Sequence, residues 1–133
     1  MRLTALIAAA FAALGGHAAG AQSGEREPFR VFFDWGKPEL TRDGEAVLQE
    51  AVAAYRQSRP GRVHVAGHTD RSGPAAVNLA ASRRRAEAVR DRLIVLGIPA
   101  AAITVRAFGE SRPIVPTEDG VREAQNRRVE IRF

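Results

Sequence analysis

The stretch GHTDRSGPAAVNLAASRRRA, residues 67–86, joins the end of one expected strand to the start of one expected helix. The strand before it, RVHVAG at 62–67, alternates valines with polar residues, which is typical of a half-buried strand. The helix extends from about residue 74 to 96, where Gly97 and then Pro99 end it. This strand, turn and helix form the centre of the predicted fold.

The other elements follow from the same kinds of pattern. Residues 29–34, FRVFFD, are rich in β-formers, and a helix is expected after Thr41 as N-cap, ending at Pro60. Two more strands are expected at 103–108 and 128–133. The segment 109–127 is expected to be mostly loop, with one helical turn near 121–124.

The order strand, helix, strand, helix, strand, loop, strand predicts an α+β fold in a single domain covering residues 29–133. We expect a mixed four-stranded sheet with two main helices packed on one face. Hydrophobic and charged residues alternate along 128–133, which predicts that solvent covers the other face of the sheet.

The N-terminal segment has the pattern of a secretory signal peptide over residues 1–21, with Ala19-Gly20-Ala21 before a cleavage site and a flexible leader at 22–28. The apolar run from Leu3 to Leu14 is too short for a spanning helix, so we expect cleavage rather than anchoring, and no transmembrane segment in the mature chain. The chain has no cysteine, which excludes disulfides and a lipid-modified Cys. These features predict export to the periplasm.

The charge is basic, with a formal net charge of +5 that falls to +4 when the signal with its single Arg2 is removed. An exported basic protein is more available to a polyanionic envelope than to nucleic acid. Nucleic-acid binding is the weakest interpretation, since the chain has one Trp and one Tyr and no aromatic residues interleaved with arginines.

Helical periodicity places two polar residues on the side of the 74–96 helix that carries its apolar residues. With about 100° per residue, Asn78 lies within about 20° of Arg85, and Val89 and Leu93 share that side. Arg83 and its neighbour in the RRR run fall on the opposite side. An inward guanidinium must find partners, because leaving it unpaired costs several kcal/mol.

Asp70 is the nearest candidate partner for Arg85, and its role has two interpretations. A simple ion pair between Asp70 and Arg85 would tie the strand to the helix, and buried ion pairs often have such a structural role. Alternatively, one carboxylate, one guanidinium and the Asn78 amide form a pocket for a zwitterionic amino-acid group, with the ammonium on Asp70 and the carboxylate on Arg85.

Catalysis is disfavoured by geometry. His64 and His68 are four residues apart in a strand, about 13 Å between α-carbons, which is too far to bind one metal ion. Ser72, His68 and Asp70 lie on one turn without an implied oxyanion hole, so they do not predict a hydrolase. No catalytic residue, metal or cofactor is expected.

Several spaced motifs closely resemble the OmpA-like peptidoglycan-binding family, which includes the OmpA C-terminal domain, Pal and MotB. They are FFDWGKPEL at 32–40, VAGHTDRSG at 65–73, the Asn78–Ala86 segment, FGESRPI at 108–114 and AQNRRVEI at 124–131. The resemblance implies non-catalytic binding of peptidoglycan through the diaminopimelate of its stem peptide.

The same resemblance implies roles for five residues. Asp70 would accept the diaminopimelate ammonium, Arg85 would bind its carboxylate and Asn78 would add an amide hydrogen bond. Asp34 would line the pocket, and Arg127 would close it. The competing hypothesis is an envelope protein-interaction module in which Asp70 and Arg85 form only a structural pair.

Overall fold

The structure is a computed structural model that describes residues 27–133, so the predicted signal peptide and most of the predicted leader lie outside the described residues. The predicted α+β class is confirmed. The elements, in chain order, are β1 (Phe29–Phe32), α2 (Arg42–Ser58), β2 (Val63–Gly67), α3 (Ala75–Val95), η1 (Ala100–Ala102), β3 (Ile103–Ala107), η2 (Ala124–Asn126) and β4 (Arg128–Arg132).

The four strands form one mixed sheet in the order β1-β4-β2-β3. The last strand, β4, lies inside the sheet and pairs antiparallel with both β1 and β2. Strands β2 and β3 pair in parallel and are connected by α3, as a βαβ unit requires. This topology brings the carboxyl end of β2 next to the start of β4.

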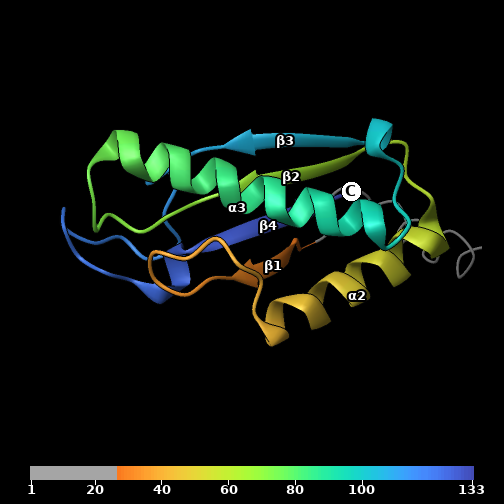
Figure 1. Cartoon of the computed structure of the whole chain (residues 1–133), viewed down its shortest axis with the longest axis horizontal. Helices are drawn as coiled ribbons and strands as arrows, with labels where there is room; N and C mark the ends of the chain where they lie inside the picture. Colours follow the sequence, from red (N-terminus) through yellow and green to blue (C-terminus); the bar gives the residue numbers. More distant parts are fainter. Residues whose placement is uncertain (1–26) are drawn as a thin grey trace, which may run out of the picture.

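Both helices cover the same face of the sheet (Figure 1), with α3 packed over β2 and β3 and α2 packed against β1. The core between them consists of buried aliphatic and aromatic side chains from every layer. It contains Val31, Phe33, Leu48, Ala51, Val52, Val63, Val65, Ala86, Val89, Leu93, Ile98, Val129 and Ile131.

Helix α2 begins and ends as its sequence predicts. The Thr41 hydroxyl accepts a hydrogen bond from the Gly44 amide at 3.0 Å, which satisfies one free donor of the first turn. The helix ends at Arg59, whose backbone is left-handed with φ of 45°, directly before Pro60.

Gly67, the last residue of β2, allows α3 to approach the sheet closely. A Cβ atom at Gly67 would overlap the carbonyl oxygen of Ser82 and lie 3.2 Å from the Cβ of Ala86. Because only glycine fits here, the middle of α3 lies directly over the end of β2. This contact sets the depth of Ser82 and, one turn later, of Arg85.

The prediction that solvent covers the other sheet face is wrong for the middle of β4. Arg128 and Glu130 point away from the helices, yet they are buried. Glu130 accepts hydrogen bonds from Arg128 at 2.8 Å, Arg30 at 3.2 Å and Arg132 at 3.3 Å. Three guanidinium groups packed around one carboxylate therefore shield that face in place of a helix.

The loop from 109 to 127 is held in shape by Asn126, which is fully buried. Its Oδ1 accepts hydrogen bonds from the amides of Ile114 and Val115, and its Nδ2 donates to the Val115 carbonyl, all within 2.9 Å. The predicted helical turn near 121–124 is displaced: a 3-10 turn lies at Ala124–Asn126 instead.

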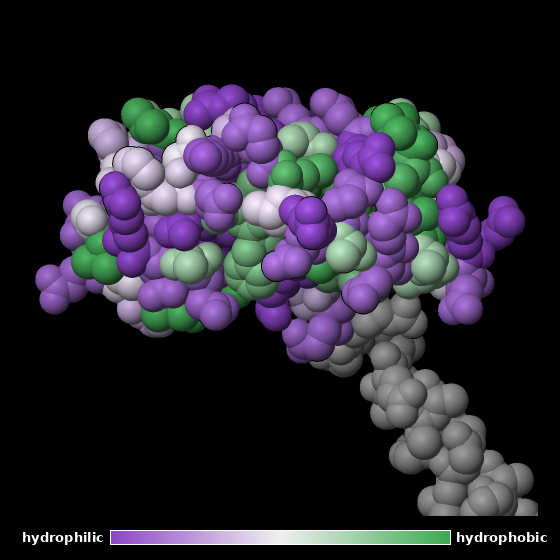
Figure 2. Space-filling view, turned by 60° about the horizontal axis from the view of Figure 1, so that its bottom comes forward, coloured by the Kyte–Doolittle hydropathy of each residue, from purple (hydrophilic) through white to green (hydrophobic). Residues whose placement is uncertain are grey.

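The surface seen in Figure 2 is mostly hydrophilic, with hydrophobic residues in separate small groups. Within residues 27–133 no helix combines the length and the apolar character needed to cross a membrane.

Candidate functional site

Four of the five predicted site residues line one cavity of about 260 Å³ at the carboxyl end of β2. They are Asp70, which follows β2, Asn78 and Arg85 on α3, and Arg127, which precedes β4. The loop between β1 and α2 forms the opposite wall. The remaining lining residues are Trp35, Gly36, Lys37, Pro38, Thr69, Ser72, Gly73, Val77, Ala81 and Arg84.

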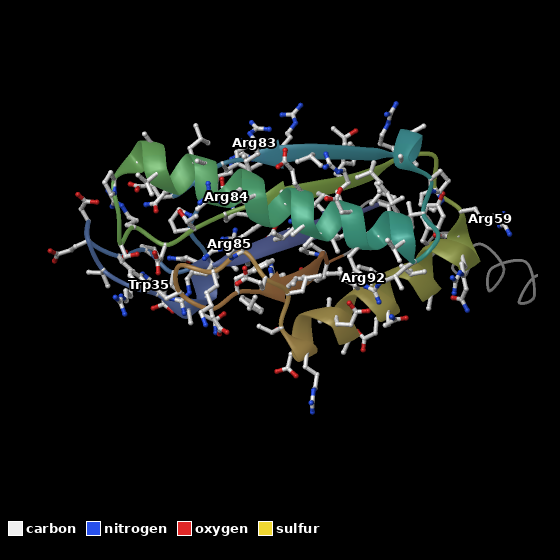
Figure 3. All side chains as sticks on the ribbon, viewed as in Figure 1. Trp35, Arg59, Arg83, Arg84, Arg85 and Arg92 are labelled. Carbon is white, nitrogen blue, oxygen red and sulfur yellow. The ribbon has the colours of Figure 1, made fainter. Side chains whose placement is uncertain are left out.

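Arg85 is buried and its guanidinium is held by backbone carbonyls. Nε donates to the Lys37 carbonyl and Nη2 to the Asp34 carbonyl, each at 3.2 Å, and the guanidinium carbon lies 5.4 Å from the centre of the Phe33 ring. Figure 3 shows Arg85 directed towards the loop between β1 and α2. The predicted inward position of Arg85 is confirmed, and it is 3% exposed.

The loop presents these carbonyls because its sequence favours a tight turn. The Lys37 amide donates to the Asp34 carbonyl at 3.2 Å, and Gly36 has a positive φ of 71°. Glycine is the residue that adopts such a φ without strain in the third position of a β-turn. The turn therefore fixes the two acceptors of Arg85 before any ligand binds.

Asp70 accepts four hydrogen bonds and is also buried. Oδ1 accepts from the Ser72 amide at 3.2 Å and the Ser72 hydroxyl at 2.6 Å, while Oδ2 accepts from the Glu123 amide and Arg127 Nη1, both at 3.1 Å. Burial alone would raise the pKa of Asp70, but the bonds from Ser72, Glu123 and Arg127 hold it below its usual value. The site therefore contains a carboxylate ion.

The structure contradicts the alternative interpretation, in which Asp70 and Arg85 form a simple ion pair. Asp70 pairs instead with Arg127, which also donates from Nε to the Phe33 carbonyl at 3.0 Å. Among residues 27–133, no ion pair includes Arg85. The reason is geometric: the turn after β1 supplies carbonyls within reach of Arg85, and Arg127 occupies the outer edge of the carboxylate.

The cavity is therefore lined by three arginines, Arg84, Arg85 and Arg127, and by Lys37, against the single carboxylate of Asp70. Burial and the nearby charge of Arg127 both lower the pKa of Arg85, whereas Asp70 raises it. Such a pocket has spare positive charge and favours a further anionic group. A carboxylate suits a guanidinium best, because the two planar groups can form paired hydrogen bonds.

Asn78 is buried as predicted, and its amide nitrogen donates to the Gly73 carbonyl at 3.0 Å and to Glu110 at 2.8 Å. These two bonds fix the turn before α3 and leave the side-chain oxygen as an acceptor for a ligand. Asp34 lies differently from its prediction: its carbonyl accepts a hydrogen bond from Arg85, but the residue lines a separate cavity of about 550 Å³ between β1 and the start of α2 and not the 260 Å³ cavity.

The other arginines of the RRR run are exposed, but they are not equivalent (Figure 3). Arg84 lies on the rim of the 260 Å³ cavity, whereas Arg83 does not line it. Helical periodicity predicted which residues of the helix face inward and which face outward, but it did not predict that Arg84 lines the cavity and Arg83 does not. Arg83 is therefore the better reference residue for tests of surface charge.

Comparison with known proteins identifies the family of the chain. Residues 32–127 match the OmpA family. The chain belongs to the OmpA family. OmpA-like domains typically bind peptidoglycan at the cell wall and are non-catalytic.

A curated relative, an outer membrane protein of Gluconacetobacter diazotrophicus, is 41% identical over 109 residues, which are 77% of this chain and 29% of that protein. Outer membrane protein A of Escherichia coli O157:H7 is 40% identical over 112 residues, covering 76% of this chain and 32% of that protein. The chain spans less than half the length of these relatives.

Among solved structures, the peptidoglycan-associated lipoprotein of Burkholderia pseudomallei has a TM-score of 0.70 and 29% identity. The match covers 80% of this chain and 88% of that chain, so the OmpA-like fold accounts for most of both proteins.

Two residues that organise the OmpA-like site were not expected from the sequence. Ser72 bridges Trp35 and Asp70, because its hydroxyl accepts from the indole nitrogen at 2.9 Å and donates to the carboxylate. Asn126 shapes the loop that carries Glu123. Asn126 lies within the AQNRRVEI motif, but nothing in its local pattern indicates bonds to residues 11 and 12 positions earlier.

Proposed function

We propose that this OmpA-like domain binds peptidoglycan without catalysis by taking the diaminopimelate of a stem peptide into the 260 Å³ cavity. Arg85 binds a carboxylate of the ligand and Asp70 accepts its ammonium. The observation that carries this proposal is the buried Arg85, whose hydrogen bonds within residues 27–133 go to two backbone carbonyls and which lies near a second guanidinium, that of Arg127.

The ligand carboxylate would meet donors already in place. Arg85 uses Nε and one Nη2 hydrogen on carbonyls, so its remaining hydrogens are available to a ligand oxygen. Because the turn at Asp34–Lys37 fixes the guanidinium in advance, little ordering cost accompanies binding. Arg127 lies close enough to share the negative charge, consistent with its predicted role in closing the pocket.

The ligand ammonium would compete for a carboxylate that already accepts four hydrogen bonds. The Ser72 hydroxyl can rotate its proton away from Asp70, which frees one acceptor position for an ammonium hydrogen. The side-chain oxygen of Asn78 supplies a second acceptor nearby. Asp34 contributes through its carbonyl, which orients Arg85, rather than through its carboxylate.

The setting of this function is the periplasm, reached by the signal peptide predicted at residues 1–21. The structural neighbours agree with a role at the wall. One of them is described as the cell wall anchor of the T6SS from Pseudomonas aeruginosa; it is 27% identical, has a TM-score of 0.61, and the match covers 75% of this chain and 72% of that chain.

The test uses two purified walls that differ at the proposed ligand. Diaminopimelate-type peptidoglycan carries the extra carboxylate, whereas lysine-type peptidoglycan keeps the ammonium and lacks that carboxylate. We expect the protein to sediment with the diaminopimelate wall and to remain in solution with the lysine wall. Equal sedimentation with both walls, abolished by salt, would instead indicate general charge attraction.

A further inference from the structure

Trp35 is an unusual residue at the rim of the proposed diaminopimelate pocket. It is the only tryptophan of the chain, it lines the same cavity as Asp70 and Arg85, and its side chain remains 47% exposed. Figure 3 places it at the left of the molecule, below and to the left of Arg85. A large exposed aromatic residue next to a binding pocket is a candidate contact surface.

The indole ring is held in a fixed orientation by two contacts. Its nitrogen donates to the Ser72 hydroxyl at 2.9 Å, and the Arg122 guanidinium carbon lies 3.5 Å from the centre of the ring. Arg122 comes from the loop between β3 and β4, so it covers one face of the ring as a cation–π partner. The exposed area therefore includes the opposite face, which is flat and apolar.

The cavity beside this face has a mixed lining. Besides Trp35 it includes both polar and apolar residues, namely Lys37, Ser72, Arg84, Pro38, Val77 and Ala81. A pyranose ring suits such a lining, because one face of the sugar presents C–H groups to the indole and to apolar side chains and its edges present hydroxyl and acetamido groups to the polar side chains.

We propose that Trp35 is a stacking platform for an N-acetylated amino sugar of the glycan strand, next to the diaminopimelate pocket. This inference rests on the proposed function. Within a muropeptide, the sugar joins the stem peptide two residues before diaminopimelate, a span of roughly 10 Å at about 3.5 Å per residue. A diaminopimelate bound at Asp70 therefore brings the sugar to the rim of the same cavity.

The experiment compares two ligands that differ only in the sugar. Isothermal titration calorimetry measures the affinity of the protein for a free diaminopimelate tetrapeptide and for the same tetrapeptide carrying its disaccharide. We expect the disaccharide form to bind about three- to tenfold more tightly. Trp35→Ala should remove that difference between the two ligands, whatever its effect on the tetrapeptide itself, whereas Trp35→Phe should retain part of the difference.

Phe32 provides the matched control, since it is a similarly exposed aromatic residue, at 41%, that does not line the 260 Å³ cavity. Phe32→Ala should keep the full preference for the disaccharide ligand. In the native protein, the disaccharide ligand should also change the intrinsic fluorescence of Trp35 more than the free tetrapeptide does.

Two results would contradict sugar stacking on Trp35 without contradicting diaminopimelate binding in the cavity. The first is equal affinity of the native protein for both ligands, and the second is an equal loss of affinity for both ligands in Trp35→Ala. The second would mean that Trp35 acts only through Ser72 on Asp70. Failure of the native protein to bind either ligand would overturn the platform and the proposed function together.

Discussion

Asp70 and Arg127 form the ion pair that closes one side of the pocket, with Nη1 3.1 Å from Oδ2 and both side chains largely buried. The pair joins the end of β2 to the start of β4, which are 57 residues apart in the chain. Because Arg127 also holds the Phe33 carbonyl, three strand ends meet at this point. The lining of the pocket is therefore part of the framework of the fold.

Asp70→Asn is expected to reduce stability as well as binding. The substitution keeps the shape of the side chain but leaves the Arg127 guanidinium without its carboxylate partner and removes a negative charge that favours the charged form of Arg85. Removing one partner of a buried pair costs roughly 3 kcal/mol or more in the free energy of unfolding. Chemical denaturation measures this loss, and an unchanged unfolding midpoint would contradict the structural role of the pair.

Gly67→Ala is expected to destabilise the domain by more than about 2 kcal/mol, because the added methyl group meets the Ser82 carbonyl of the helix backbone. Gly61→Ala is the matched control, since a Cβ there has no neighbour within 4 Å. Thermal unfolding of both variants tests the prediction. Similar midpoints for the two would show that α3 does not approach β2 as closely as described.

Asn126→Ala is expected to loosen the loop from 109 to 127. It leaves the amides of Ile114 and Val115 without their acceptor, which costs roughly 2–4 kcal/mol. Hydrogen exchange should accelerate at these two amides. Gln125, the neighbouring residue with an exposed side-chain amide, provides the control. Gln125→Ala should leave the exchange rates of the Ile114 and Val115 amides and the stability of the domain close to native.

The pH dependence of stability should carry the signature of His68. Burial and the charge of Arg128 lower the pKa of His68 from 6.5 to about 4, so between these pH values the unfolded chain takes up a proton that the folded chain does not. The free energy of unfolding therefore falls as the pH decreases from 6.5 to 4, on the order of 3 kcal/mol in total. His68→Phe should flatten this part of the profile.

Glu130 should extend the acid sensitivity to lower pH in both the native protein and His68→Phe. Burial would raise the pKa of Glu130, but hydrogen bonds from Arg128 and Arg30 lower it from 4.5 to about 2. Its stabilising contribution is complete above pH 4.5 and is lost as the pH falls towards 2. A profile that is flat below pH 4.5 would contradict the buried cluster around Glu130.

The sequence predicted the elements and the inward residues because those depend on local periodicity. Asn78 and Arg85 are seven residues apart, so a rotation of about 100° per residue places them on the same side of α3, and both are buried. Strand alternation similarly identified which residues of β4 face away from the helices. The alternation could not show what covers these residues. Solvent was expected, but the arginines around Glu130 bury that part of the strand.

The pairing inside the pocket was beyond local patterns. Asp70 lies closer in sequence to Arg85 than to Arg127, yet the sheet order β1-β4-β2 brings Arg127 to the carboxylate. The Asp34–Lys37 turn likewise supplies two backbone carbonyls that accept hydrogen bonds from Arg85, and no side-chain motif in the sequence predicts them. Contacts between distant segments depend on topology, so local patterns placed Asn78 and Arg85 on the inner side of α3 but did not identify the hydrogen-bond partners of Arg85 or Asp70.

The role proposed for Arg85, binding of the ligand carboxylate, is tested by measuring the affinity of three proteins for a diaminopimelate stem peptide. The three are the native protein, Arg85→Ala and Arg83→Ala, and circular dichroism shows that each variant is folded. We expect Arg85→Ala to lose roughly 2–5 kcal/mol of binding free energy and Arg83→Ala to bind like the native protein. Equal affinities for all three would contradict a recognition role for the buried guanidinium of Arg85.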